Sequence, residues 1–217
     1  MKASILVPSS LNEVTLKQYQ KFVRLDQDVD LSTPFYMQKL VEIFCGIDLR
    51  DVANIRYKSL VDTVEHIQGL FKSKSKFINR FTMHGVEYGF IPVLDDISLG
   101  EYVDLDNYLS DPNNMHKAMA VLYRPITHSK DDRYDIEPYK GTDKANDFLD
   151  MPLDVALGAY VFFYHLNKEL VSVTMNCLEM EEVDSELKQI LEENGGGIKA
   201  YMHSLKEILQ DLDISQR

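Results

Sequence analysis

Residues Pro152–Met180 read PLDVALGAYVFFYHLNKELVSVTMNCLEM, and the first half of this stretch decides the fold. Between Val155 and Leu166 nearly every side chain is apolar, and His165 is the only ionisable one. A helix that is apolar on all sides lies either in a membrane or deep inside a folded domain. This run is shorter than the ~20 residues that a bilayer requires, so we expect a buried central helix. Gly158 in the run would let another backbone segment approach closely.

The composition is that of a soluble, folded protein. The chain has 217 residues, of which 45% are hydrophobic and 27% charged, and this length is sufficient for a sizeable core. Its net charge of −12 argues against general nucleic-acid binding, which needs clustered Lys and Arg. Cys45 and Cys177 lie far apart in apolar segments, which predicts buried thiols rather than a disulfide or a metal site. The apolar run at the N-terminus is too short for a signal peptide, so we expect a cytosolic protein.

Helical patterns cover the first part of the chain. Thr15 and Gln18 form a capping-box pattern that opens a helix to about Leu25. A second helix is expected between Pro34 and Gly46, followed by a short one over residues 49–55. A further helical stripe is marked by apolar side chains at helical spacing, namely Leu60, Val64, Ile67 and Phe71. Residues 1–71 are therefore predicted to form an N-terminal helical lobe.

The pattern changes at Lys72, where a polar connector begins. Apolar runs over residues 77–83 and 86–91 flank His84-Gly85, which predicts a β-hairpin. Helices are expected from Ser98 to Leu109 and from Asp111-Pro112 to Pro125, and Thr127–Asp147 is predicted to be a loop holding at most a short strand. The chain beyond Glu181 is acidic and amphipathic, and a glycine linker at residues 195–197 precedes a terminal helix over 198–212. We expect a mainly α (α+β) fold in one compact body of two loosely distinct lobes. Residues 72–217 form the second lobe, which holds the small inserted hairpin and the central helix.

No sequence motif in the chain predicts catalysis. The six histidines never occur at the spacing that places two metal ligands on one helix face. The glycines at 195–197 lack the strand, Lys and Ser/Thr of a phosphate-binding loop, and no G-x-S-x-G nucleophile motif is present. The sequence therefore predicts no catalytic residue, no metal and no cofactor.

Carboxylates and tyrosines are concentrated between residues 95 and 111. The candidate partner-binding residues in this segment are Asp95, Asp96, Glu101, Tyr102, Asp104, Asp106 and Tyr108. Aromatic side chains surrounded by charge are typical of protein–protein contacts. The basic run of Lys72, Lys74, Lys76 and Arg80 could meet this acidic face on another copy, which would give a homo-oligomer.

Two other interpretations of these acids stay open. The segment is equally consistent with a solvated surface that keeps the chain soluble. A metal-dependent hydrolase could instead use a pair of the acids between Asp95 and Asp111 around a divalent cation. Asp135, Glu137 and Lys140 are a weaker nuclease-like set, because the spacing from Glu137 to Lys140 is one residue too long.

The terminal helix provides a second candidate surface. Four apolar side chains on one face of this helix are the candidate contacts to a partner, namely Tyr201, Leu205, Ile208 and Leu212. The alternative is that this face docks on the central helix of the same chain.

Three strings of the sequence resemble a group of small acidic proteins encoded by tailed bacteriophages, which are similar to tail assembly chaperones. The strings are MHGVEYGFIPVLDDISLGEYVDLDNYL (83–109), NMHKAMAVLYRPI (114–126) and MPLDVALGAYVFFYHLNKEL (151–170). The resemblance implies a non-enzymatic virion-assembly protein in the host cytoplasm that binds the tape-measure or tail-tube protein, with no nucleic acid or membrane as partner. A structural virion component, such as a neck, connector or tail subunit, is the alternative, and a phage protein that modulates a host enzyme by mimicking nucleic acid is a third possibility.

Overall fold

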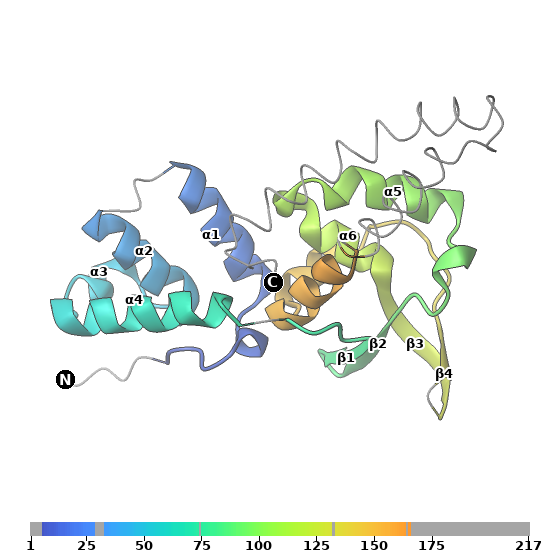
Figure 1. The fold of residues 1–217 in the computed structure, drawn as a ribbon, viewed down its shortest axis with the longest axis horizontal. Coiled ribbons are helices and arrows are strands. Elements are labelled where there is room, and N and C mark those ends of the chain that lie inside the picture. The colour runs from blue at the N-terminus through green and yellow to red at the C-terminus, as the bar shows by residue number, and fades with distance from the viewer. Residues whose placement is uncertain (1–5, 29–32, 74, 132, 164, 166–217) are drawn as a thin grey trace, which may run out of the picture.

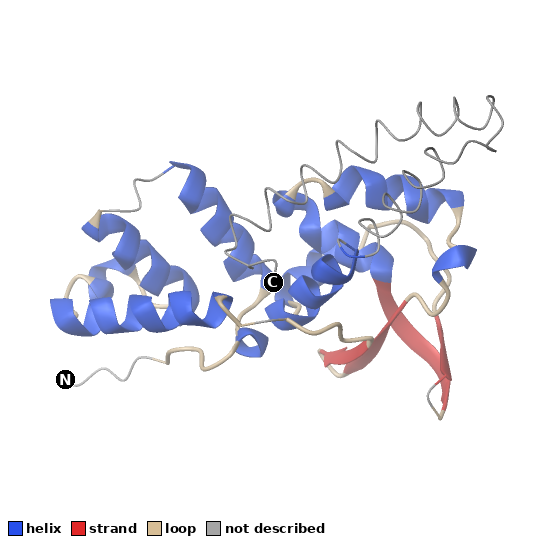
Figure 2. Ribbon diagram, viewed as in Figure 1, coloured by secondary structure: helices blue, strands red, loops and turns tan. Residues whose placement is uncertain are grey.

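The fold is helix-rich with one small antiparallel sheet (Figures 1 and 2). The computed structural model describes residues 6–28, 33–73, 75–131, 133–163 and 165, without the side chains of residues 26–28 and 95. Helices α1–α4 lie at one end of the molecule, α5, α6 and the sheet lie at the other end, and the central helix lies between them (Figure 1). This architecture confirms the mainly α (α+β) class. Among the described residues, no helix combines the length and the apolar content needed to cross a membrane.

The N-terminal helices begin where the sequence predicts, although α1 ends three residues later than expected, at Asp28, and α3 ends three residues earlier, at Val52. A short 3-10 turn, η1 (Leu11–Glu13), precedes α1 (Leu16–Asp28), α2 (Pro34–Cys45), α3 (Leu49–Val52) and α4 (Tyr57–Phe71). The capping box of α1 is formed, because Thr15 N donates to Gln18 Oε1 at 2.8 Å and Gln18 N donates to Thr15 Oγ1 at 3.3 Å. Gly46 ends α2 with a φ of 66°, the left-handed conformation that glycine adopts without strain.

The sheet is larger than the sequence predicts. It contains β1 (Arg80–Met83), β2 (Val86–Phe90), β3 (Tyr123–Lys130) and β4 (Arg133–Ile136), in the order β1-β2-β3-β4 with every pair antiparallel. The hairpin of β1 and β2 turns at His84-Gly85, and Met83 pairs with Val86.

The prediction of a loop over Thr127–Asp147 is wrong, because β3 continues to Lys130 and β4 follows it. The helix predicted to reach Pro125 also ends earlier, at Leu122, where β3 takes over. Pro125 argues against a strand, and β3 shows no apolar alternation, since its last four side chains are all exposed. The alternation in β4 is only four residues long. These segments become strands because β3 pairs with β2 and β4 pairs with β3.

The helices of the second half cover the central helix and the sheet. They are η2 (Leu94–Asp96), α5 (Leu99–Leu109), η3 (Pro112–Asn114), α6 (Met115–Leu122) and η4 (Ala145–Asp150). Ser98 and Glu101 form the capping box predicted for α5. Helix α6 is almost wholly inside the fold, since six of its eight residues are buried.

The central helix is buried as predicted over the part that the structure describes. Residues 153–163 are helical, and the side chains of Leu153, Ala156, Leu157 and Tyr160 are inaccessible to solvent. The predicted stretch beyond residue 165 lies outside the described residues. Gly158 packs against the backbone of Lys76, so close that an added Cβ would lie 2.2 Å from the Lys76 carbonyl oxygen.

Backbone bonds join the N-terminal helices to the central helix. Leu16 N donates to Met151 O at 2.9 Å, and Leu153 N donates to Val14 O at 2.8 Å. Gln20, which is buried in α1, donates to the carbonyl oxygens of Pro112 and Asn113 at 2.9 Å each. These contacts cross the predicted lobe boundary near Lys72, and a single hydrophobic core cluster includes residues from both sides of it.

Gly89 in β2 leaves room for the Tyr134 ring of β4. An added Cβ at this position would lie 2.3 Å from Tyr134 Cε2 and 3.0 Å from Ile126 Cγ1. Tyr134 is held in place because its hydroxyl donates to Phe90 O at 2.8 Å. We expect Gly89→Ala to lower the free energy of unfolding by about 2 kcal/mol, because the Tyr134 ring must move and lose this bond.

Urea denaturation of Gly89→Ala measures this cost, and the Tyr134→Ala background provides its control. In the Tyr134→Ala background, which lacks the tyrosine ring, Gly89→Ala should lower the free energy of unfolding much less than it does in the parent chain. An equal cost in both backgrounds would contradict the steric explanation.

Candidate functional site

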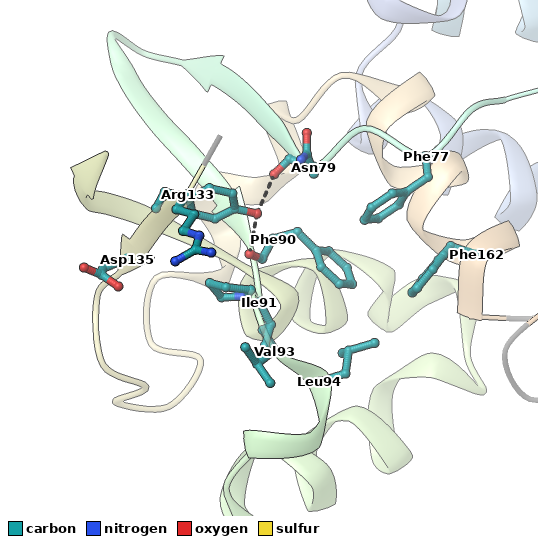
Figure 3. Close-up of a pocket in the computed structure, with 11 residues that line it drawn as sticks. Phe77, Asn79, Phe90, Ile91, Val93, Leu94, Arg133, Asp135 and Phe162 are labelled. Atoms are coloured by element: carbon teal, nitrogen blue, oxygen red, sulfur yellow. Dashed lines mark hydrogen bonds between the residues drawn. The ribbon is translucent and has the colours of Figure 1, made fainter. Parts of the chain in front are cut away.

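An open groove lies where the second strand, the fourth strand and the central helix meet. It encloses about 730 Å³, and we call it the aromatic groove (Figure 3). Its lining residues are Phe77, Asn79, Phe90, Ile91, Pro92, Val93, Leu94, Arg133, Tyr134, Asp135 and Phe162. They come from the segment before β1, from the end of β2 and the residues after it, from β4, and from the central helix.

Three phenylalanine rings form one end of the aromatic groove. The Phe77 ring stacks on the Phe162 ring with centroids 4.6 Å apart, and it meets the Phe90 ring edge-on at 4.8 Å. Phe90 is buried, whereas Phe77 is 40% exposed and Val93 is 51% exposed. The groove therefore has a fixed apolar floor and a rim of apolar side chains that reach solvent.

Polar groups at the other end hold β4 in position and add charge to the rim. Tyr134 donates its hydroxyl to Phe90 O, and the Arg80 guanidinium lies 4.4 Å from the centre of the Tyr134 ring. Burial raises the pKa of the Tyr134 hydroxyl, although the positive charge of Arg80 opposes this rise. Arg133 and Asp135 are exposed and lie at the end opposite Phe77 and Phe162 (Figure 3). These groups can bind and orient a polypeptide, whose peptide groups and apolar side chains they match.

The outer face of α5 is a second apolar surface. Leu99, Tyr102 and Val103 are 78%, 58% and 46% exposed, and their spacing of three and four residues places them on one helix face. Asp106 continues this face and is also exposed. Large apolar side chains gathered on one exposed face are typical of an interaction surface.

The predicted acidic surface is only partly exposed. Glu101 is 5% exposed, and its carboxylate accepts bonds from Ser98 N at 2.7 Å, from Ser98 Oγ at 2.6 Å and from the Arg124 guanidinium. Burial raises the pKa of Glu101, but the bonds from Ser98 and the charge of Arg124 outweigh this effect and leave the pKa below its usual value. Glu101 therefore stabilises the fold and is not available to a partner.

The remaining predicted residues of this segment divide between the interior and the surface. Asp104 is half-buried and accepts a hydrogen bond from the Tyr139 hydroxyl; burial and this bond together raise the pKa of Tyr139. Tyr108 is half-buried beneath Lys117, whose Nζ lies 5.3 Å from the ring centre. Asp96 is exposed in η2, next to Asp95, whose side chain is not described.

The acids considered for a hydrolase are not gathered in the described part of the chain. Asp111 caps η3 by accepting from Asn113 N at 2.9 Å. Asp135 lines the aromatic groove, whereas Glu137 and Lys140 line a different cavity of about 500 Å³ beside Tyr88. Within the described residues, no three His, Cys, Asp or Glu side chains are close enough together to hold a metal ion.

The two other predicted surfaces are the apolar face of the terminal helix and the basic run from Lys72 to Arg80. The terminal-helix residues Tyr201, Leu205, Ile208 and Leu212 lie outside the described residues. Of the basic run, Lys72 and Lys76 are exposed and Lys74 lies outside the described residues. Arg80 is half-buried, because its guanidinium lies against the Tyr134 ring and donates to Ser129 Oγ at 3.1 Å.

Of the residues that line the aromatic groove, the sequence singles out only Asp135, and for a different role. Phe77 and Phe162 belong to segments predicted to be a strand and a buried helix, so the sequence places both in the core. Leu99 and Val103 share helical spacing with Tyr102, and this signal could have identified the apolar face of α5.

No protein family, no curated protein and no solved structure is similar enough to this chain to count as a match. What the chain does must therefore be inferred from its own residues and surfaces.

Proposed function

We propose that this chain is a non-enzymatic assembly protein of a tailed phage that binds an apolar segment of another polypeptide. In its most specific form, it is a tail assembly chaperone that acts in the host cytoplasm on the tape-measure or tail-tube protein. The aromatic groove carries the proposal, because it offers exposed apolar side chains above a rigid aromatic floor. The resemblance of residues 83–170 to phage assembly proteins suggests the biological setting.

The groove suits a peptide segment better than a small polar metabolite. Its apolar end can take large aliphatic or aromatic side chains, each of which contributes about 1.5–3 kcal/mol when fully buried. Arg133 and Asp135 at the other end carry opposite charges and can set the direction in which the segment lies. The net charge of −12 keeps the complex soluble while the groove covers an apolar part of the client.

An open groove also suits reversible binding. It contacts its client from one side, so only part of the client surface is removed from water. A chaperone must release its client when assembly proceeds, which requires such a moderate affinity.

Val93→Glu is the direct test of this function. Val93 is half-exposed on the rim of the groove, so the substitution should leave the fold intact while it places a charge against an apolar client. We expect binding of the purified tape-measure or tail-tube protein to weaken at least about tenfold, as measured by isothermal titration calorimetry. Tyr57→Glu, which changes an exposed apolar residue of α4 away from the groove, should stay close to the parent Kd. No binding by the parent chain, or equal binding by Val93→Glu, would overturn the proposal.

The composition of purified virions distinguishes the chaperone from a structural virion component. A chaperone leaves before the tail is complete, so mass spectrometry of purified particles should not detect this chain. Its presence at the copy number of a tail, neck or connector protein would assign it to the structural class instead.

A further inference from the structure

Helices α1 and α2 form a basic groove that the proposed client binding does not use. It encloses about 760 Å³ and is lined from α1 by Lys17, Gln18, Lys21, Arg24 and Leu25, and from α2 by Lys39, Glu42, Ile43 and its capping residue Gly46. We call it the basic groove. It contains four cations and one carboxylate, in a chain whose net charge is −12.

The cations of the basic groove differ in how they are already engaged. Arg24 donates from Nε to Asn113 Oδ1 at 2.7 Å, and Lys39 pairs with Glu42 at 2.6 Å. Lys17 and Lys21 are exposed, lie one helical turn apart, and have no ion pair or hydrogen bond with any residue that the structure describes. Two positive charges thus face solvent beside the half-buried Leu25 and Ile43.

The chain itself contains a segment of complementary chemistry. Residues 179–193 read EMEEVDSELKQILEE, with seven carboxylates and one lysine. The apolar residues of this segment recur at helical spacing, at Met180, Val183, Leu187, Ile190 and Leu191. An apolar stripe flanked by acids matches a groove in which apolar side chains are flanked by lysines.

The connecting chain is long enough for the segment to reach the groove of its own molecule. Leu153 N bonds to Val14 O, so the central helix begins beside the start of α1. At 1.5 Å per residue, Phe163 and the far end of the basic groove each lie roughly 15 Å from that point. The sixteen residues from Phe163 to Glu179 span up to roughly 50 Å when extended. A tether of this length gives an effective concentration on the order of millimolar, which favours the same chain over a second copy.

We infer that the basic groove between α1 and α2 docks the acidic segment 179–193 of the same chain. Lys17 and Lys21 pair with its carboxylates, and Leu25 and Ile43 receive its apolar stripe. A nucleic-acid backbone also carries negative charge, but it lacks the apolar stripe and is repelled by the acidic remainder of the chain. The basic groove and the aromatic groove share no residue, so this docking is independent of client binding.

Hydrogen–deuterium exchange of the full-length chain tests the docking. Residues 179–193 should be protected, and Lys17→Glu/Lys21→Glu should raise their exchange rate about tenfold, because the docked state is lost. Lys58→Glu, an exposed lysine of α4 outside the groove, should leave that rate unchanged. Adding Glu181→Lys/Glu182→Lys to the groove variant should restore much of the protection, since the charges are then exchanged. An unchanged thermal unfolding temperature confirms that each variant is folded.

Carbodiimide cross-linking identifies the contact and its origin. Amide links from Lys17 or Lys21 to acids of 179–193 are expected within single chains in a mixture of ¹⁴N and ¹⁵N protein. Three outcomes would each overturn the inference. The links could form equally often to Lys58 and Lys130, or they could form only between labelled and unlabelled chains. Residues 179–193 could also show no protection from hydrogen–deuterium exchange.

Discussion

Replacing Gly158 with alanine should destabilise the protein by about 3 kcal/mol or more. The added Cβ would lie 2.2 Å from Lys76 O, 3.0 Å from Lys76 C and 3.4 Å from Phe77 Cα. All three are backbone atoms, so no side-chain rotation can relieve the overlap. The segment before β1 would have to move away from the central helix and leave a gap in the core beside it.

Urea denaturation measures this loss, and Gly69→Ala provides a matched control. Gly69 is also helical, but nothing lies within 4 Å of the Cβ that alanine would add there. That substitution should be neutral or stabilise the protein by up to about 1 kcal/mol, because glycine is the poorer helix former. If both substitutions changed the free energy of unfolding equally, the contact between Gly158 and the Lys76 backbone would not be the cause of the loss.

Gly158→Ala should also weaken client binding more than its stability loss alone explains. Phe77 follows Lys76 directly, and its ring forms the exposed end of the aromatic groove. A displaced Lys76 would shift this ring relative to Phe162. Calorimetric titration at a temperature where the variant is still folded separates this effect from unfolding.

Glu101→Gln should cost about 2–4 kcal/mol of unfolding free energy at neutral pH. The side chains of Glu101 and Arg124 are only 7% and 13% exposed, so the substitution leaves the Arg124 charge buried without its anionic partner. It also weakens the capping bonds from Ser98 at the start of α5. Asp106→Asn removes a carboxylate from the exposed face of the same helix and should change the stability by less than about 0.5 kcal/mol.

The double variant Glu101→Gln/Arg124→Met shows whether the unpaired Arg124 charge causes the stability loss of Glu101→Gln. If the unpaired buried charge dominates, the double variant should be more stable than Glu101→Gln alone. A double variant whose cost equals the sum of both single costs would show that the two residues act independently.

The stability difference between the parent chain and the Glu101→Gln variant should depend on pH in a defined direction. The pKa of Glu101 lies below its usual value, since Ser98 and Arg124 favour the charged form in the folded state more than burial disfavours it. A lowered pKa contributes stability that is fully present above the unfolded-state value of about 4.3, and this contribution is lost as the pH falls through the folded-state value. The difference between parent and variant should therefore be constant from about pH 6 to 8 and shrink below about pH 4. A difference that grows on acidification would contradict this assignment.

The sequence predicts only part of the candidate site. The pattern from Asp95 to Tyr108 predicts a contact surface, but it gives no reason to weight one acid above another. Folding turns Glu101 and Asp104 toward Arg124 and Tyr139, and it leaves Tyr102 and Asp106 on the outer face of α5. The partners of Glu101 and Asp104 lie 23 and 35 residues further along the chain, so local spacing could not reveal these pairs.

By itself, the sequence determined the helices, their caps and the buried central helix, because these depend on local bonds and on apolar periodicity. In the sequence, Gly158 only permits a close backbone approach, and the structure shows that the segment at Lys76 makes it. Only the tertiary structure decided that β3 and β4 are strands, because β3 pairs with β2 and β4 in turn pairs with β3. It also decided where the aromatic groove and the basic groove lie, since each is formed by side chains from segments that meet only after folding.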